Sequence, residues 1–274
     1  MSHPIRHILL PALFLLVSAC NATTPTKQGN PAPVLSGIES RGELILGTSA
    51  NMAPMNFVRD DGKVVGVDID IARFMADAMD AKLTIKTLPF KDLLPALQRG
   101  EVDVVISNMT ITQKRNMKVA FVGPYMKSGK CIVTKQDNLA KAEQAEDLNT
   151  PDTVIAVMEG TTSQDFVATL LPDATIVPTR NQQDAVAMVK NNQAGGMLTD
   201  YPVCLSTLKD NPDAGFVTLF SLLSYEPIGI ALPATDPLLI NWSEHFLQRM
   251  EALGIMDEIS ARWFGEYADA IKPE

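Results

Sequence analysis

The chain has 274 residues, 46% hydrophobic and 20% charged, so its composition is that of a globular protein and excludes a disordered one. This length is sufficient for a large core and for two lobes or domains. The formal net charge of −9 and the pI near 4.9 argue against a nucleic-acid partner, because such partners normally require a basic surface.

The first twenty residues, MSHPIRHILLPALFLLVSAC, have the features of a secretory signal. A short basic start precedes an apolar run that is too short to span a membrane, and small residues come before Cys20. The ending V-S-A-C resembles the bacterial lipoprotein cleavage site, which implies a signal peptide over residues 1–19 and a lipid on the thiol of Cys20. Ordinary cleavage nearby, with Cys20 unmodified, is the alternative.

After this signal the sequence predicts a tether and then alternating strands and helices. Residues 20–36 are polar and rich in proline, threonine and glycine, so a flexible tether is expected there. Strands are expected at 43–49, 82–88, 102–107, 130–135, 153–158, 175–178, 195–200 and 227–232. Helices are expected at 68–81, 92–100, 236–254 and 255–265. This alternation predicts α/β sheets covered by helices.

Polar residues follow several of the expected strands. In open α/β sheets, ligands bind outside the carboxyl ends of the strands. Hydroxyl, amide and charged side chains occur there, namely Ser107, Asn108, Thr110 and Arg115 after one strand, EGTTS at 159–163 after another, and Asp200 after a third. Such a mixture suits a small polar molecule.

Arg115 lies in the first turn of a helix that Thr112 is expected to cap, where a cation opposes the helix dipole. A guanidinium beside hydroxyls and a helix start is a receptor for a carboxylate, and Thr162 stands at a second helix start. Asp200 supplies the opposite charge for an ammonium. We therefore expect a site for a zwitterion, an α-amino acid. The alternative is a surface ion pair for Arg115 and a helix-capping role for Asp200.

Catalytic residues are scarce in this sequence. Two of the three histidines lie in the signal and His245 falls in a late amphipathic helix, so the sequence suggests no Ser–His or Cys–His pair. It contains neither metal-ligand spacing nor a nucleotide-binding glycine motif. We expect no catalytic residue, no metal and no cofactor. An enzyme would have to use a lone carboxylate such as Glu159 or Glu226, and solvent exposure is the ordinary expectation for both.

Besides Cys20, the chain contains Cys131 and Cys204. Two cysteines in an oxidising compartment can form a disulfide. They can equally be two buried apolar thiols. Their spacing does not decide between these possibilities.

Five stretches of the sequence carry recognisable motifs: GTSANMAPMNF, the helix start GVDID, PFKDLLPALQRGEVDVVISNMTITQKR, VMEGTTS and MLTDYP. Through them, residues 38–266 resemble the bacterial solute-binding proteins of polar amino-acid ABC transporters. The first two stretches match the opening of that family, with Val67 where an aromatic or larger aliphatic residue is usual. The third is the most recognisable, and the last two match later ligand-binding segments.

The resemblance implies an α/β, two-lobed periplasmic-binding-protein fold of type II, in which each lobe is a mixed sheet flanked by helices. Lobe 1 is expected over residues 37–126 and lobe 2 over residues 127–228. The return strand and C-terminal helices of lobe 1 are expected over residues 229–274. Two hinge crossings are expected, near Pro124–Gly129 and Tyr225–Pro233.

Carried over by position, the resemblance implies that Arg115 binds the ligand carboxylate with Thr110 and Thr162. Asp200 and the region of Asn108 would receive the ammonium. The side-chain pocket would contain Phe90, Met52 and Ser49, and the neighbouring candidates are Thr161 and Ser163.

This pocket is neutral and apolar, so a neutral amino acid is expected. An inward-pointing Glu159 would instead favour a cation. For Met52, core packing is the alternative.

The function that the resemblance implies is the substrate-binding component of an amino-acid ABC importer. Such a protein is exported to the periplasm or cell envelope, here as a monomer anchored by the lipid on Cys20. Its lobes close on the ligand, and it delivers the ligand to a membrane permease with its ATPase. Two alternatives stay open, a periplasmic enzyme similar to cyclohexadienyl dehydratase and a ligand-sensing subunit without transport.

Overall fold

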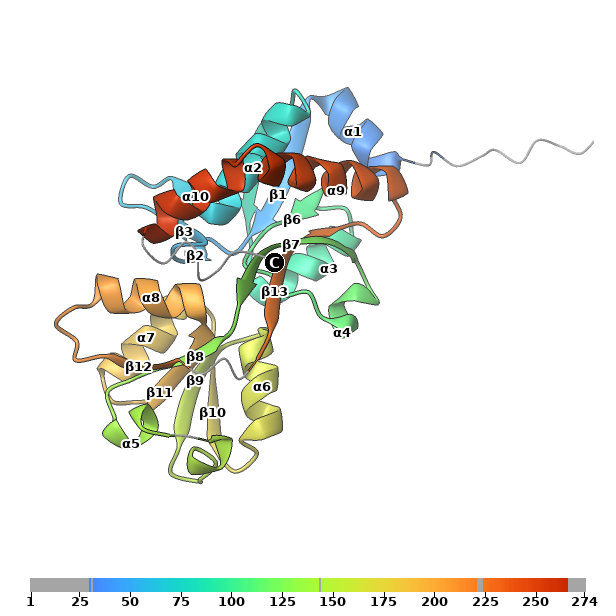
Figure 1. The fold of residues 1–274 in the computed structure, drawn as a ribbon. Helices are drawn as coiled ribbons and strands as arrows, with labels where there is room; N and C mark the ends of the chain where they lie inside the picture. Colours follow the sequence, from blue (N-terminus) through green and yellow to red (C-terminus); the bar gives the residue numbers. More distant parts are fainter. Residues whose placement is uncertain (1–29, 31, 143, 221–223, 266–274) are drawn as a thin grey trace, which may run out of the picture. The chain divides into compact units, whose positions relative to one another are not determined.

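The computed structural model describes residues 30, 32–142, 144–220 and 224–265. The predicted signal peptide and the predicted lipid site at Cys20 lie outside these residues. The chain divides into two units, Met1–Asn30 and Pro31–Glu274. The described part of the second unit contains two five-stranded sheets and a small three-stranded sheet (Figure 1).

The first sheet has the strand order β5-β1-β6-β13-β7. Strand β1 (Glu43–Thr48) is parallel to β5 (Lys82–Thr87) and to β6 (Val104–Val105). Strand β13 (Glu226–Leu232) is antiparallel to β6 and to β7 (Ala120–Ser128). We call this sheet and the helices that pack on it lobe 1.

The second sheet has the order β10-β9-β11-β8-β12. Strand β9 (Val154–Met158) is parallel to β10 (Thr175–Thr179) and β11 (Gly196–Asp200). Strand β8 (Lys130–Thr134) is antiparallel to β11 and to β12 (Val217–Phe220). We call this sheet and its helices lobe 2. The small sheet contains β2 (Asn51–Met52), β3 (Asn56–Val58) and β4 (Val64–Val65).

Helices cover the sheets of both lobes (Figure 1). Those in lobe 1 are α1 (Pro33–Arg41), α2 (Val67–Ala78), the 3-10 turn η1 (Phe90–Asp92), α3 (Leu93–Gln98), α4 (Gln113–Asn116), α9 (Pro237–Ala252) and α10 (Ile255–Phe264). Those in lobe 2 are α5 (Asp137–Ala140), the 3-10 turn η2 (Ala145–Asp147), α6 (Thr162–Leu170), α7 (Gln182–Lys190) and α8 (Tyr201–Asp210). None of the helices in the described part of the chain is both long and apolar enough to cross a membrane.

Successive residues of the central strands in lobe 1 face opposite sides of its sheet. Val104 and Ile230 pack in the larger apolar cluster with α2 and α9, whereas Val105 and Ala231 pack in a second cluster with α3. This is the period-two alternation of a strand that is buried on both faces. The sheet is therefore covered on both sides, and its strand ends are left to form the site.

The chain passes between the two sheets twice. Strand β7 ends at Ser128 and β8 begins at Lys130, while β12 ends at Phe220 and β13 begins at Glu226. Glu226 is the register partner of Ser128, so the strands that cross between the lobes are neighbours. These positions are within a few residues of the predicted lobe bounds at 127 and 228.

The predicted tether over residues 20–36 is wrong at its end, because α1 already begins at Pro33. A proline at the first helical position favours the start of a helix. Asp236, which is fully buried, accepts hydrogen bonds at Oδ2 from the backbone N–H groups of Val34 (2.8 Å) and Leu35 (2.9 Å). Its other oxygen caps α9. One carboxylate thus stabilises the starts of two helices that are far apart in the sequence, which local composition cannot reveal.

Candidate ligand-binding site

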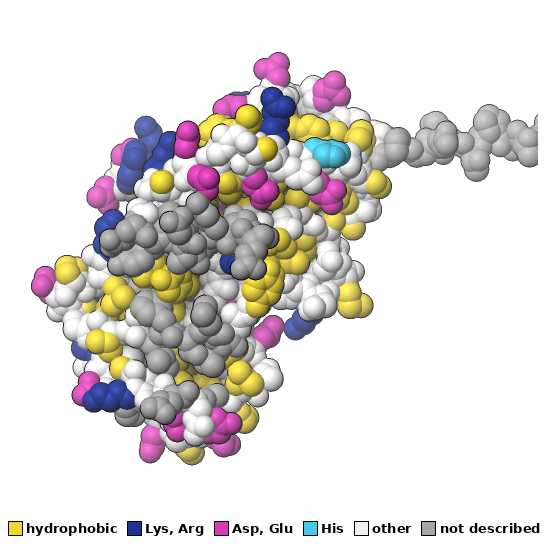
Figure 2. Space-filling model, viewed as in Figure 1, with side chains coloured by type: hydrophobic (Ala, Val, Ile, Leu, Met, Phe, Trp, Pro, Cys, Tyr) yellow, Lys and Arg dark blue, Asp and Glu magenta, His cyan; other side chains and the backbone are white. Residues whose placement is uncertain are grey.

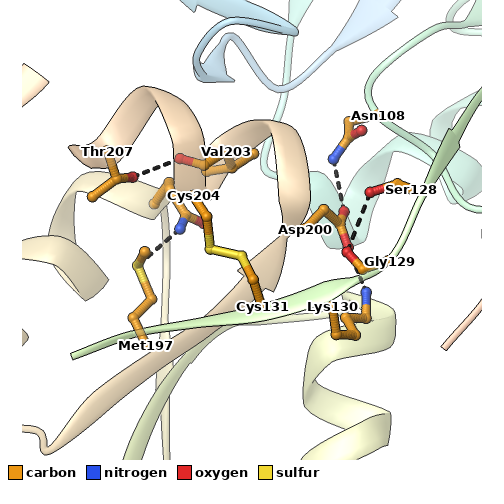
Figure 3. Close-up of a disulfide and its surroundings, with 11 residues drawn as sticks. Asn108, Ser128, Gly129, Lys130, Cys131, Met197, Asp200, Val203, Cys204 and Thr207 are labelled. Carbon is orange, nitrogen blue, oxygen red and sulfur yellow. Dashed lines mark hydrogen bonds and ion pairs between the residues drawn. A yellow bond between two sulfur atoms is a disulfide. The ribbon is translucent and has the colours of Figure 1, made fainter. Parts of the chain in front are cut away.

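The strand ends of the two lobes meet in a network of direct contacts. Nδ2 of Asn108, after β6, donates to Oδ2 of Asp200 at the end of β11 over 2.8 Å (Figure 3). Nη2 of Arg115 donates to the carbonyl oxygen of Gly160 over 3.1 Å. The hydroxyl oxygens of Thr110 and Thr162 are 3.4 Å apart. The structure therefore brings together the predicted carboxylate-binding and ammonium-binding residues from two separate sheets.

Arg115 is held in place by local contacts. The hydroxyl of Thr112 accepts the backbone N–H of Arg115 (3.2 Å), so the predicted N-cap is confirmed. Nη1 donates to the carbonyl oxygen of Thr110 (2.9 Å), and the guanidinium carbon lies 5.5 Å from the ring centroid of Phe90, a cation–π contact. Among the described residues, no carboxylate forms an ion pair with Arg115 at 4 Å or less, so the predicted alternative of a surface ion pair is wrong.

The guanidinium of Arg115 is half-buried, and among the described residues its hydrogen-bond acceptors are backbone carbonyl oxygens. Burial lowers the pKa of its guanidinium, and the more distant carboxylates of Asp200, Glu226 and Asp165 oppose this shift. The guanidinium remains protonated and bonded only to neutral groups. A carboxylate placed beside it would compensate the buried charge.

Asp200 occupies the N-cap position of α8, yet its side chain makes no capping hydrogen bond, so the helix-cap alternative is wrong. Its Oδ1 accepts instead from Nζ of Lys130 over 2.5 Å (Figure 3). Nζ of Lys130 also donates to the hydroxyl of Thr162 (2.7 Å). The side chain of Lys130 is only 1% exposed. Reasoning from the sequence missed this lysine, because nothing local distinguishes it from other strand lysines.

Glu226 does not have the solvent exposure that the sequence led us to expect. It is 6% exposed, its Oε2 accepts the hydroxyl proton of Thr162 (2.9 Å), and the same oxygen is 3.4 Å from Nζ of Lys130. The reason is the return strand β13, whose first residue lies beside the start of β8. Glu159, in contrast, is partly exposed and forms an ion pair with Lys91 of lobe 1 (2.9 Å).

A cavity of about 570 Å³ is lined by residues of both lobes, among them Phe90 and Ser49, which were predicted for the side-chain pocket. Its lining includes none of Asn108, Thr110, Arg115, Thr162 and Asp200, and Phe90, whose ring contacts Arg115, connects it to them. The other lining residues are Asn51, Thr87, Leu88, Pro89, Lys91, Glu159, Arg180 and Asn181. Met52 is not among them. It is 3% exposed and belongs to the buried cluster that also contains Phe90 and Val203, which agrees with the core-packing alternative.

The remaining predicted hydroxyls already have functions within the protein. The hydroxyl of Ser49 donates to Oδ1 of Asn56 (2.8 Å). The hydroxyl of Thr161 donates to the carbonyl oxygen of Met158 (2.7 Å) and caps α6. Ser163 is 3% exposed in the first turn of α6. The hydroxyls of Ser49 and Thr161 are therefore engaged within their own lobes, whereas those of Thr110 and Thr162 lie close to each other between the lobes.

Gly160 allows the two lobes to approach closely. Its φ of +80° is in the left-handed region, and a Cβ at this position would lie 2.8 Å from Cβ of Lys91 in the other lobe. Only glycine fits without displacing the backbone. Its carbonyl oxygen is the one that Arg115 contacts.

Two buried amide oxygens in the site have no hydrogen-bond partner among the described residues. They are Oδ1 of Asn108 and Oδ1 of Asn51. Asn108 is 2% exposed and adopts a φ of +49°, a conformation that asparagine tolerates better than most residues. Buried acceptors are nearly always paired in native proteins, so a donor on a ligand would complete this site.

Asp68, from the GVDID stretch, holds the backbone of Asn108 in place, a role that the sequence did not predict. Its Oδ2 accepts the backbone N–H of Asn108 (2.9 Å) and Nδ2 of Asn56 (2.6 Å), and its Oδ1 accepts the hydroxyl of Tyr125 (2.6 Å). Burial raises the pKa of Asp68 from 3.8 to about 7, although the three hydrogen bonds act in the opposite direction.

We expect the buried carboxyl of Asp68 to make stability depend on pH. Its raised pKa means that the folded state retains a proton that the unfolded state releases near pH 4. This contribution to stability is therefore fully present below the unfolded pKa and is lost as the pH rises through about 7. Relative to Asp68→Asn, the wild type should lose about 2 kcal/mol of unfolding free energy between pH 5 and pH 8, measured by urea unfolding.

Asp61→Asn provides the matched control. Asp61 is exposed, and its hydrogen bond with Arg59 lowers its pKa to about 2, so it is ionised in both states above pH 5. Its stability difference from the wild type should stay constant over the same range. A wild-type curve parallel to that of Asp68→Asn would contradict the assignment.

Cys131 and Cys204 are joined by a disulfide (Figure 3). It links β8 to α8 beside the site, since Cys131 follows Lys130 and α8 begins directly after Asp200. Both cysteines are buried. The disulfide thus fastens the two elements that carry the Lys130–Asp200 pair.

On the face seen in Figure 2, acidic and basic side chains of the described residues are dispersed, without a continuous basic patch. Among the described residues, no group of three or more His, Cys, Asp or Glu side chains is arranged to hold a metal ion.

Comparison with known proteins identifies relatives with the same architecture. An ancestral amino acid-binding protein, AncCDT-1, described as a precursor of cyclohexadienyl dehydratase, is 37% identical with a TM-score of 0.77, covering 84% of this chain and 98% of its own. An ancestral arginine-binding protein bound to arginine is 34% identical with a TM-score of 0.78, covering 82% and 99%. The predicted type II periplasmic-binding-protein fold is confirmed.

Relatives are also found by sequence. The ABC transporter arginine-binding protein 1 of Escherichia coli is 28% identical over 231 residues, which are 83% of this chain and 93% of that protein. The ABC transporter glutamine-binding protein GlnH of Bacillus subtilis is 25% identical over 259 residues, which are 92% and 93%. The family model of the bacterial extracellular solute-binding proteins, family 3, matches residues 44–266. The chain therefore belongs to family 3 of the bacterial extracellular solute-binding proteins.

Proposed function

We propose that the chain is the substrate-binding component of an amino-acid ABC importer. It binds a free amino acid between its lobes and delivers it to a membrane permease and the associated ATPase. One observation carries this proposal: Arg115, a half-buried cation with no carboxylate partner among the described residues, lies across the site from the buried carboxylates of Asp200 and Glu226. Relatives named as binding proteins of amino-acid ABC transporters support it.

In this proposal the ligand carboxylate binds Arg115 and the hydroxyl of Thr110, which lies beside Thr162 at the start of α6. The ligand ammonium binds near Asp200 and donates to the unpartnered Oδ1 of Asn108. The predicted role of Thr162 changes, because its hydroxyl is already engaged with Lys130 and Glu226 on the ammonium side. A zwitterion contacts both lobes at once and thus favours their closed arrangement.

The cavity beside Phe90 supports a neutral side chain on the ligand. Its charged lining residues are Lys91, Arg180 and Glu159, and Glu159 is already paired with Lys91. A cationic side chain would face two cations and one neutralised carboxylate, which is unfavourable. Relatives of this chain have been solved with arginine and with glutamine, so the fold itself accommodates both types.

A thermal-shift screen of all amino acids, with protein that lacks residues 1–20, tests this function. Ligands that bind the folded state raise the melting temperature by mass action. Neutral amino acids should give the largest rise. A response to lysine and arginine alone would contradict the neutral ligand, and no response to any amino acid would contradict the function.

Binding without catalysis is part of the same proposal. The site carboxylates that an enzyme similar to cyclohexadienyl dehydratase would need are paired, since Asp200 and Glu226 both contact Lys130. The relation to AncCDT-1 makes prephenate and arogenate the right substrates to assay. Turnover of either substrate would overturn this part of the proposal. A role in sensing without transport would be revealed if a strain that lacks this protein took up the amino acid at the wild-type rate.

We also propose that residues 1–19 are a signal peptide and that a lipid on Cys20 anchors the monomeric protein to the cell-envelope membrane. Membership of a family of extracellular proteins supports the export. In fractionated cells, Cys20→Ser should move the protein from the membrane to the soluble fraction of the envelope. Retention of that variant in the membrane would contradict the anchor.

A further inference from the structure

The acid proposed to receive the ligand ammonium already binds an ammonium of the chain itself. Nζ of Lys130 lies 2.5 Å from Oδ1 of Asp200, 3.4 Å from Oε2 of Glu226 and 2.7 Å from the hydroxyl of Thr162. All three partners are at the centre of the site, between the two lobes. Asp200 alone therefore does not define the charge that a ligand meets.

Lys130 is a permanent part of this cluster. Its side chain is 1% exposed, and those of Asp200 and Glu226 are 11% and 8% exposed. Removing a buried ammonium from two carboxylates would leave both anions uncompensated, which is strongly unfavourable. A ligand ammonium is therefore expected to join the cluster and not to replace Lys130.

The charge count of the cluster matches a single ligand ammonium. Two carboxylates and one lysine leave one net negative charge, whereas Asp200 with Lys130 alone would be neutral. Glu226 thus restores the negative charge that Lys130 cancels. The unpartnered Oδ1 of Asn108 independently indicates a missing donor next to Asp200, because Nδ2 of the same amide contacts Asp200.

The fold explains how these residues meet. Lys130 is the first residue of β8, directly after one crossing between the lobes, and Glu226 is the first residue of β13, directly after the other. The two crossing strands are neighbours, so the pair forms where the lobes are joined. Glu226 comes from lobe 1, and Lys130 and Asp200 come from lobe 2.

We propose that Lys130 and Glu226 are specificity-determining residues: their ion pair sets the charge of the ammonium subsite to one net negative charge, so that the site selects 2-amino acids over 2-hydroxy acids of the same side chain. This inference rests on the proposed amino-acid binding. It assigns the discrimination to the balance among three residues and not to Asp200 alone.

Matched ligand pairs and charge variants test this inference. Each amino acid that binds is compared with its 2-hydroxy acid by isothermal titration calorimetry, for example L-alanine with L-lactate and L-phenylalanine with L-phenyllactate. The variants are Glu226→Gln, which makes the cluster neutral, and Lys130→Met with Glu226→Gln, which restores one negative charge through Asp200. Lys135→Met, a lysine close to the end of the same strand that contacts the carbonyl oxygen of Lys190, is the control.

Glu226→Gln should reduce the preference for the amino acid by about tenfold to a hundredfold, since one charge a few ångströms away has been removed. The double variant should recover the preference to within about tenfold of the wild type, and Lys135→Met should not change it. Melting curves show whether each variant is folded. Glutamine retains the shape and the acceptor oxygen of Glu226, so Thr162 and Lys130 keep a partner.

Two results would overturn the inference, and they differ from failure of the proposed function. If the Glu226→Gln variant binds amino acids as tightly as the wild type or more tightly, the ligand ammonium replaces the ammonium of Lys130 and does not join it. If the double variant prefers the amino acid as weakly as Glu226→Gln does, the net charge of the cluster does not determine this preference. If the wild type binds no amino acid at all, the proposed function and this inference fall together.

Discussion

Replacing Arg115 with alanine is expected to abolish the rise in melting temperature that a bound amino acid causes. The guanidinium is half-buried, and among the described residues no carboxylate lies within ion-pair distance of it. Removing one partner of a buried, hydrogen-bonded charge pair costs about 2–5 kcal/mol, which corresponds to an affinity loss of about thirtyfold to a thousandfold or more. Thermal shift and isothermal titration calorimetry measure this loss.

Two further variants make the Arg115 result specific. Arg115→Lys keeps the charge but cannot hold a carboxylate with two parallel hydrogen bonds, so it should retain only part of the affinity. Arg99→Ala removes an exposed arginine that pairs with Glu101 on the surface and should leave binding unchanged. If Arg115→Ala bound an amino acid with wild-type affinity, the carboxylate would have to bind elsewhere, and the proposed orientation of the ligand would be wrong.

Loss of the Cys131–Cys204 disulfide should produce the largest change in stability. The two cysteines are 73 residues apart, and in the chain-entropy model such a crosslink stabilises the folded state by about 4 kcal/mol. The double variant Cys131→Ala with Cys204→Ala should therefore melt about 10 °C lower than the wild type. Differential scanning calorimetry under non-reducing conditions measures this difference.

Reductant supplies the control for the disulfide. It should lower the melting temperature of the wild type and leave that of the double variant unchanged. Because β8 carries Lys130 and α8 follows Asp200, the reduced protein should also bind its ligand more weakly. A wild type that melts at the same temperature after titration of two free thiols would show that the crosslink adds no stability.

Local chemistry made much of the site readable from the sequence. A helix cap depends on residues three or four positions apart. Thr112 therefore predicted the turn that carries Arg115, and GTTS predicted the start of α6. A strand end depends only on where an apolar run stops, which placed Asn108 and Asp200 at sheet edges. The sequence did not predict β7, β12, the small sheet or the helices α1, α5 and α7, whose apolar patterns are short or interrupted, and it indicated α8 only as the helix that Asp200 would cap.

Taken by itself, the sequence determined the α/β class, the family and the opposite charges of Arg115 and Asp200, because each depends on residue types and short spacings. Only the tertiary structure decided which distant groups meet. Lys130, Asp200 and Glu226 lie on three strands and become partners through the order of those strands in space. Burial also decided their role. An exposed carboxylate is screened by water and has little effect on binding, whereas a buried one contributes to the net charge that a ligand meets.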